Sequence, residues 1–132
     1  MNKELEMLAR RFIEFEGEEV PEKLSDNAII DEDKSVRWNR EEVKKHNENR
    51  KAIILENKKQ KNQLYEAWKQ KVLEEIMKEG FTTKQAEHIY DFAYDEAGCI
   101  GDSTLVGIYD AVTYVVQFLN ELKEGWNYGS RN

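Results

Sequence analysis

The stretch from Asn39 to Glu79 reads NREEVKKHNENRKAIILENKKQKNQLYEAWKQKVLEEIMKE, and it contains neither Gly nor Pro. Its start has the residues of a capping box, with Asn39 as the N-cap and Glu42 at the third helical position. Trp38 and Val43 flank this box in the positions of a hydrophobic staple. The stretch therefore predicts one long helix that begins at residue 39.

The end of the same stretch also carries a helix signal. Gly80 fits the left-handed position that follows a helix, and Phe81 then falls where an apolar contact with Ile76 is expected. A helix over about 39–79 would be about 60 Å long, whereas a compact domain of 132 residues is roughly 35 Å across. The helix is expected to bend, to break or to reach beyond its own domain, and the fully polar stretch 56–63 is where a break would fall.

Three further helices follow from periodicity and caps. Residues 3–16 have apolar side chains spaced three and four apart and predict a short N-terminal helix. Thr82 and Gln85 form a second capping box, which begins a helix at 83–97.

The last helix is predicted at 103–124, with Asp102 or Ser103 as its cap and Gly125 as its end. Its apolar residues again alternate at three and four. Gly107 is expected to mark a close crossing with the turn at 98–101.

These elements predict an all-α protein. Helices 64–79, 83–97 and 103–124 are expected to form a three-helix core, in which the last two make a C-terminal helical hairpin. The aromatic residues Trp68, Tyr90, Tyr94, Tyr109, Tyr114 and Phe118 are assigned to that core. The sequence divides into residues 1–38, a short helix followed by an irregular acidic arm, and residues 39–132, the helical core domain. The arm at 17–38 is expected either to lie along the long helix or to bind a partner.

Charge is distributed unevenly around a net value of −7. Residues 1–33 have a balance of −7, residues 34–80 one of +5 and residues 81–132 one of −5. A basic helix flanked by acidic segments leaves open a nucleic-acid binder, but such a site needs Lys and Arg gathered on one face. Glutamates are interspersed among the lysines here, so direct binding of nucleic acid is not expected.

Composition excludes several classes of site. The single cysteine, Cys99, allows no internal disulfide and no cysteine-based zinc site. The chain lacks a Gly-rich phosphate loop and any serine in a nucleophile context, so the sequence predicts no catalytic residue and no cofactor. No signal peptide or membrane span is recognised, and a cytoplasmic protein is expected.

One acidic ridge is a candidate metal site. Glu87, Asp91 and Asp95 stand at i, i+4 and i+8, where three like charges on one helix favour a compensating cation. In this respect the chain resembles the all-helical nucleotide pyrophosphohydrolases of the MazG and dimeric dUTPase type, which bind magnesium with carboxylates on two facing helices. Their paired E-x-x-E and E-x-x-D helices are not found together here. A metal-dependent hydrolase is thus one alternative. The other is an exposed acidic surface that is complementary in charge to the basic helix.

Candidate partner-binding residues come from the long helix and the arm. Val43, Ile53 and Ile54 are apolar positions on a helix too long for its own core, and Trp38 adds to them. These residues are expected to meet a second copy of the chain, with a dimer favoured, or a folded-back arm. The charge run Asp31, Glu32 and Asp33 makes the arm a candidate for binding a protein partner.

Two stretches are similar to small helical accessory proteins of Gram-positive bacteriophages. They are VRWNREEVKKHNE at 36–48 and IYDFAYDEAG at 89–98, the latter followed by GIYDAV at 107–112. The second resembles the "AYE-x-GHS-x-G" helical pairs of these proteins, with Cys99 and Ile100 in place of the His-Ser. The resemblance implies a small accessory or host-directed protein. We therefore expect a non-enzymatic protein of inhibitor or adaptor type that occupies a surface of a partner, a host protein in the host cytoplasm if the chain is phage-encoded. It transfers no catalytic residue.

Overall fold

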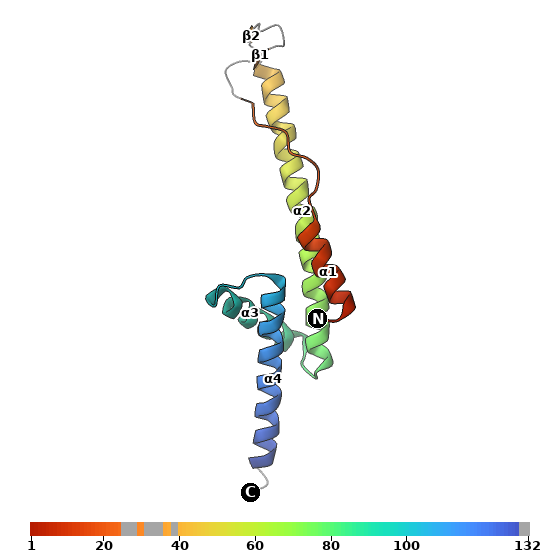
Figure 1. Ribbon diagram of the computed structural model, residues 1–132, viewed down its shortest axis with the longest axis vertical. Helices are drawn as coiled ribbons and strands as arrows, with labels where there is room; N and C mark the ends of the chain where they lie inside the picture. Colours follow the sequence, from red (N-terminus) through yellow and green to blue (C-terminus); the bar gives the residue numbers. More distant parts are fainter. Residues whose placement is uncertain (25–28, 31–35, 38–39, 130–132) are drawn as a thin grey trace. The chain divides into compact units, whose positions relative to one another are not determined.

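The computed structural model describes residues 1–24, 29–30, 36–37 and 40–129, and it is all-α as the sequence predicts (Figure 1). Its helices over these residues are α1 (Lys3–Glu14), α2 (Arg40–Lys78), α3 (Thr83–Cys99) and α4 (Leu105–Gly129). Two short strands, β1 (Ile29–Ile30) and β2 (Val36–Arg37), pair in antiparallel fashion, with Ile29 opposite Arg37. The sequence did not predict this pair, because two residues per strand are too few to show a period.

The long helix is continuous. α2 runs for 39 residues, and the polar stretch 56–63 does not interrupt it. Part of this stretch is in fact in contact with the rest of the chain, because Asn57 and Lys61 both bind segments that precede α2. The expected N-cap, Asn39, lies outside the described residues.

Two helix ends agree with the sequence. Gly80 follows α2 with a φ of 99°, the left-handed conformation that Gly adopts without strain. The capping box of α3 is complete, because Thr82 accepts a hydrogen bond from the Gln85 backbone N–H at 3.1 Å. The Gln85 side chain in return accepts one from the Thr82 N–H at 2.9 Å.

The ends of α4 differ from expectation. Its N-cap is Thr104, not Asp102 or Ser103, since the Thr104 hydroxyl accepts a hydrogen bond from the Gly107 N–H at 3.0 Å. Asp102 instead holds the cap in place by accepting from the Thr104 hydroxyl at 2.6 Å. At the other end Gly125 does not terminate α4, which continues to Gly129. A single Gly in a helix costs only about 1 kcal/mol, so it is not by itself a stop.

The chain divides into two compact units, at positions other than the residue 38/39 boundary of the sequence analysis. The core unit comprises residues 1–10 and 66–132, and the arm unit comprises residues 11–65. In the core unit the end of α2 packs with α3 and α4, as predicted, and the start of α1 adds Leu5 and Ala9. The largest fully buried side chains there are Trp68, Tyr90, Leu5, Ile76, Ile108 and Val72. Each large apolar side chain contributes roughly 1.5–3 kcal/mol on burial.

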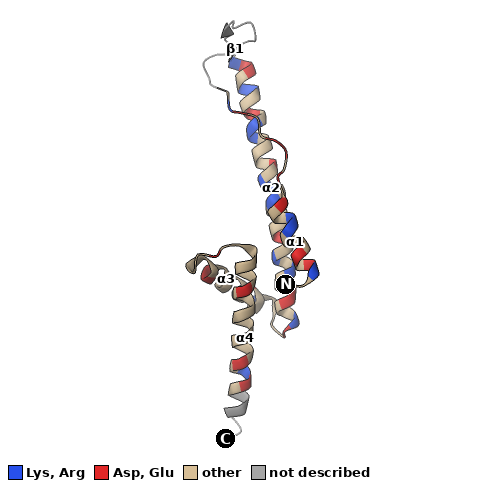
Figure 2. Ribbon diagram, viewed as in Figure 1, with Lys and Arg blue, Asp and Glu red and all other residues tan. Residues whose placement is uncertain are grey.

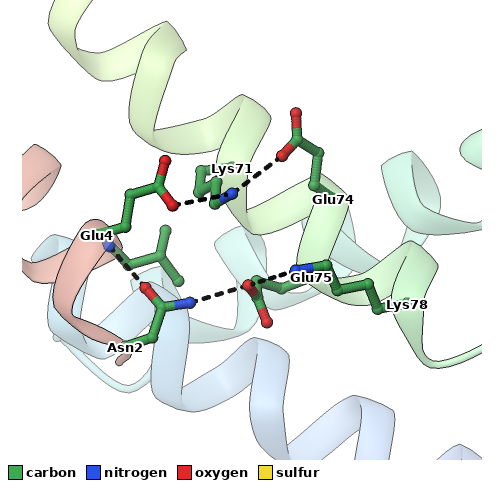
Figure 3. A network of polar contacts seen from close by, with 7 residues as sticks. Asn2, Glu4, Lys71, Glu74, Glu75 and Lys78 are labelled. Atoms are coloured by element: carbon green, nitrogen blue, oxygen red, sulfur yellow. Dashed lines mark hydrogen bonds and ion pairs between the residues drawn. The ribbon is translucent and has the colours of Figure 1, made fainter.

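Polar contacts fasten the start of α1 to the core unit (Figure 3). The Lys71 ammonium lies 3.1 Å from the Glu4 carboxylate and 3.3 Å from that of Glu74. Its hydrogen bonds to Glu4 and then Glu74 raise the pKa of Lys71 above the ordinary 10.5. Asn2 caps α1 by accepting from the Leu5 N–H at 2.8 Å and donates to Glu75 at 2.9 Å.

In the arm unit, residues 17–24 run along α2, which is the first of the two arrangements expected for the arm (Figure 1). Asn57 accepts from the Glu18 N–H at 2.9 Å and donates to the Glu18 carbonyl at 2.8 Å. Asn47 binds the N–H and carbonyl of Leu24 in the same way, at 3.0 and 3.1 Å. Between them, the Arg50 Nε donates to the Pro21 carbonyl at 2.9 Å. The arm is therefore held through its main chain.

Candidate protein-interaction surface

α3 has one face in the core and another that is open. Ala86, Tyr90, Ala93 and Ala97 are buried, as the periodicity predicts. On the open side, Phe92 is more than half exposed, and so is Ile100, which caps the helix. Apolar side chains of this size are exposed here without a covering element among the described residues.

α4 exposes a ridge of large apolar side chains. Tyr114, Phe118 and Leu122 follow one another at i, i+4 and i+8, and their exposed fractions are 70%, 50% and 53%. The assignment of Tyr114, Phe118 and the half-exposed Tyr94 to the core is therefore wrong. After residue 111, α4 has apolar residues on more than one of its sides. α2 and α3 pack against one part of this apolar surface and leave the rest exposed.

Several of the exposed apolar residues of α3 and α4 line one seam between the two helices. One hollow of about 520 Å³ is lined by Phe92, Ile100, Tyr114 and Phe118 among others. The next hollow, of about 820 Å³, is lined by Phe81, His88, Leu119 and Leu122 among others. The two hollows follow each other on one face of α3. The residues of α3 that line them are spaced three or four apart, with Gln85 and His88 in the second hollow and Phe92 and Glu96 in the first. We call this surface the seam.

The seam has opposite charge at its two ends. Glu96, Asp102 and Asp110 border the first hollow, and among the described residues no Lys or Arg lines it. Lys123 borders the second hollow, where its ammonium lies 4.2 Å from the centre of the Phe81 ring. Figure 2 shows much of α4 in tan, the colour of residues other than Lys, Arg, Asp and Glu. The seam is thus apolar in its length, acidic at one end and basic at the other.

The absence of a side chain at Gly107 allows Asp102, one of the three carboxylates at the acidic end of the seam, to lie close to the start of α4. A Cβ at Gly107 would lie 2.5 Å from the Asp102 carbonyl oxygen, which is closer than packed atoms allow. The close approach expected at Gly107 therefore exists, but it is to Asp102 and not to the turn at 98–101. Asp102 is fixed beside the start of α4 by this approach and by its bonds to Thr104.

The partner-binding residues proposed on α2 are only partly available. Val43 is 3% exposed, so its side chain is covered within the chain and is not open to a second copy. Ile53 is half-buried and Ile54 is partly exposed, and the neighbouring Leu55, which the sequence analysis did not single out, is more exposed than either. Trp38, Asp31, Glu32 and Asp33 lie outside the described residues.

The acidic ridge of α3 is exposed, as its spacing suggests. Glu87, Asp91 and Asp95 all face solvent, and within the described parts of the chain no three acidic, His or Cys side chains converge as metal ligands. Glu87 and Asp91 border a hollow that they share with Lys69 of α2, whose ammonium lies 5.0 Å from the Tyr90 ring centre. A lysine of the basic helix therefore stands beside two of the three carboxylates.

The basic helix does not present a purely basic face. Lys and Arg alternate with Asp and Glu along α2 (Figure 2). One hollow beside α2 is bordered by four cations together with the carboxylate of Glu48; the cations are Lys23, Arg40, Lys44 and Lys51. Lys61 is engaged within the arm unit, 4.9 Å from the centre of the Phe12 ring.

Among the described residues, no helix is both long and apolar enough to cross a membrane. Comparison with known proteins finds no matching family model, no matching curated protein and no matching solved structure.

Proposed function

We propose that this is a non-enzymatic binding protein, of adaptor or inhibitor type, that acts by occupying a surface of a protein partner through the seam. The observation that supports it is the set of large apolar side chains that line the seam and remain exposed. Contiguous apolar patches on a soluble protein are uncommon and mark interaction sites. Tyr, the residue type of Tyr114, is among those that contribute most binding free energy at interfaces. Phe, the residue type of Phe92 and Phe118, is enriched in the cores of interfaces.

The resemblance to phage accessory proteins extends this proposal. The partner would be a host protein, and the complex would form in the host cytoplasm. The exposed Ile54 and the half-buried Ile53 support a second part of the proposal, in which α2 pairs two copies of the chain as a dimer.

The experiment is capture of the partner from host lysate on the immobilised full-length protein. The variant Tyr114→Ser/Phe118→Ser removes the centre of the seam and should abolish capture of any specific partner. The matched control is Val106→Ser, which alters an exposed apolar residue of the same helix that does not line the seam. Leu55→Ser is the equivalent control on α2.

Both controls should capture the partner as the unaltered protein does. If Tyr114→Ser/Phe118→Ser still captures the partner and Leu55→Ser does not, the binding surface lies on α2 and not on the seam. Circular dichroism of each variant establishes that a loss of capture is not a loss of fold.

A further inference from the structure

We infer that the seam binds an amphipathic α-helix of the partner that carries Lys or Arg at one end and apolar residues along its length. This inference rests on the proposed function and names the chemistry of the partner. Three properties of the seam support it: its length, the helical nature of its walls and its charge.

The dimensions suit a helix. The α3 wall of the seam runs from Gln85 to Ile100, which at 1.5 Å per residue is about 22 Å, the length of a four-turn helix. Both walls are helices. On α4 the exposed apolar side chains Tyr114, Phe118 and Leu122 recur at i, i+4 and i+8, and on the α3 wall Phe92 and the C-cap Ile100 are separated by eight positions, or about two turns. A helix laid in such a groove presents its own apolar residues at i, i+3, i+4 and i+7 to match.

The charges select a basic helix and give it a direction. Glu96, Asp102 and Asp110 stand at one end of the seam, and no Lys or Arg from the part of the chain that the structure describes lines their hollow. Cationic side chains of a bound helix would face these carboxylates, while Lys123 at the other end would repel them. Complementary charge of this kind fixes the register of a complex and speeds its formation.

A second copy of the chain fits the seam less well. A two-fold interface places the same patch against itself. Parallel seams would set three carboxylates against three, which repel one another. Antiparallel seams would set the three carboxylates of each copy against Lys123 of the other, the one cation that lines the seam among the described residues. That single cation matches three carboxylates less well than a helix that carries several Lys or Arg.

Two labelled model peptides test the inference by fluorescence anisotropy on the full-length protein. Both are 16-residue helices with the same Leu and Ala face, and one has three Lys at one end where the other has three Glu. Three exposed ion pairs should make the Lys peptide bind roughly tenfold more tightly than the Glu peptide at low salt. The difference should shrink at 0.5 M NaCl, because salt screens exposed pairs.

Charge reversal supplies the sharper test. Glu96→Lys/Asp110→Lys should reverse the preference, so that the Glu peptide binds more tightly. Glu87→Lys/Asp91→Lys makes the same change in charge away from the seam, on residues that line neither of its hollows, and should leave the preference in place. Tyr114→Ser/Phe118→Ser should weaken both peptides.

Three outcomes would overturn the inference. Equal binding of the two peptides would show that the seam binds apolar helices without preference for a basic one. The proposed function would then still be tested separately by the capture experiment. Binding of neither peptide would exclude a helix as the occupant. A dimer of the protein that dissociates on Tyr114→Ser/Phe118→Ser would identify a second copy as the occupant. The proposed function itself fails only when the seam variants also capture the partner normally.

Discussion

At the scale of single residues, two asparagines of α2 hold the arm. An Asn side chain has the same donor and acceptor as a peptide group, so Asn47 and Asn57 each pair with one residue of an extended chain. This pairing leaves the backbone N–H and carbonyl of Glu18 and Leu24 satisfied without a neighbouring strand.

Asn57→Ala should loosen the arm at Glu18. The substitution removes both hydrogen bonds to Glu18, each worth about 0.5–1.5 kcal/mol. The amide hydrogen of Glu18 should therefore exchange faster by about tenfold, as measured by NMR. Asn62→Ala, at an exposed position five residues further along α2, is the control and should leave that amide unchanged. Equal exchange in the two variants would show that the Asn57 pairing adds nothing.

Two glycines of the α3–α4 hairpin should respond oppositely to alanine. Gly98 lies inside α3 with room for a Cβ, so Gly98→Ala should stabilise the protein by about 0.5–1 kcal/mol. Gly107→Ala would force Asp102 away from the start of α4 and should cost about 1–3 kcal/mol. Urea unfolding at constant pH measures both. A Gly107→Ala protein as stable as the original would contradict the close approach.

At the scale of elements, the attachment of α1 should weaken in alkali. Hydrogen bonds to Glu4 and Glu74 raise the pKa of Lys71, so the folded protein holds that proton more tightly than the unfolded chain does. The stabilisation is complete below pH 10.5 and is lost as the pH rises through the higher folded-state pKa. Thermal melts from pH 8 to 12 should therefore show an alkaline loss that is smaller in Lys71→Met. Lys84→Met, at an exposed site of α3, should lose stability in alkali as the original does.

The elements were predictable where the determinants are local. The α3 capping box and the left-handed Gly80 each depend on residues within four positions, and both are as predicted. Thr104 was missed as a cap because Asp102 and Ser103 are equally good capping residues, and only the approach of Gly107 decides between them.

Tertiary contacts were harder to predict. Asn47, Arg50 and Asn57 are three and seven residues apart, a helical spacing that places them on one side of α2. The sequence contains this spacing, but it does not reveal which segment that side contacts. α2 binds the main chain of the arm, which leaves no pattern in the side chains of residues 17–24. The seam was missed for a related reason: Tyr114 and Phe118 have the same periodicity whether a helix covers them or not.

At the scale of the whole molecule, the exposed Ile54 predicts self-association through α2. Sedimentation equilibrium should give a dimer, and Ile54→Glu should shift it toward the monomer by burying a charge in the contact. Phe118→Glu should leave the dimer intact, because the seam is assigned to another partner. A monomer at all concentrations would remove the dimer from the proposal.

Nucleic acid should not bind at physiological salt. The net charge of −7 repels polyanions, and Glu48 lies among the cations of α2. Filter binding to duplex DNA checks this expectation. Micromolar affinity with a log–log salt slope near −3 to −4, lost in Lys44→Glu/Lys51→Glu, would instead show about four phosphate contacts through α2.

The way α2 holds the arm also affects how this protein changes over evolutionary time. Side chains of α2 bind the backbone carbonyls of residues 18, 22 and 24. Because these hydrogen bonds do not involve the side chains at 18, 22 and 24, replacement of those side chains should be tolerated. Gly17 is the exception, since its φ of 73° and its contact with Asn57 both exclude a side chain. Homologous proteins should therefore conserve Gly17, Asn47 and Asn57. The acidic residues of the arm should vary among them, which would change the charge of the arm at little cost in stability.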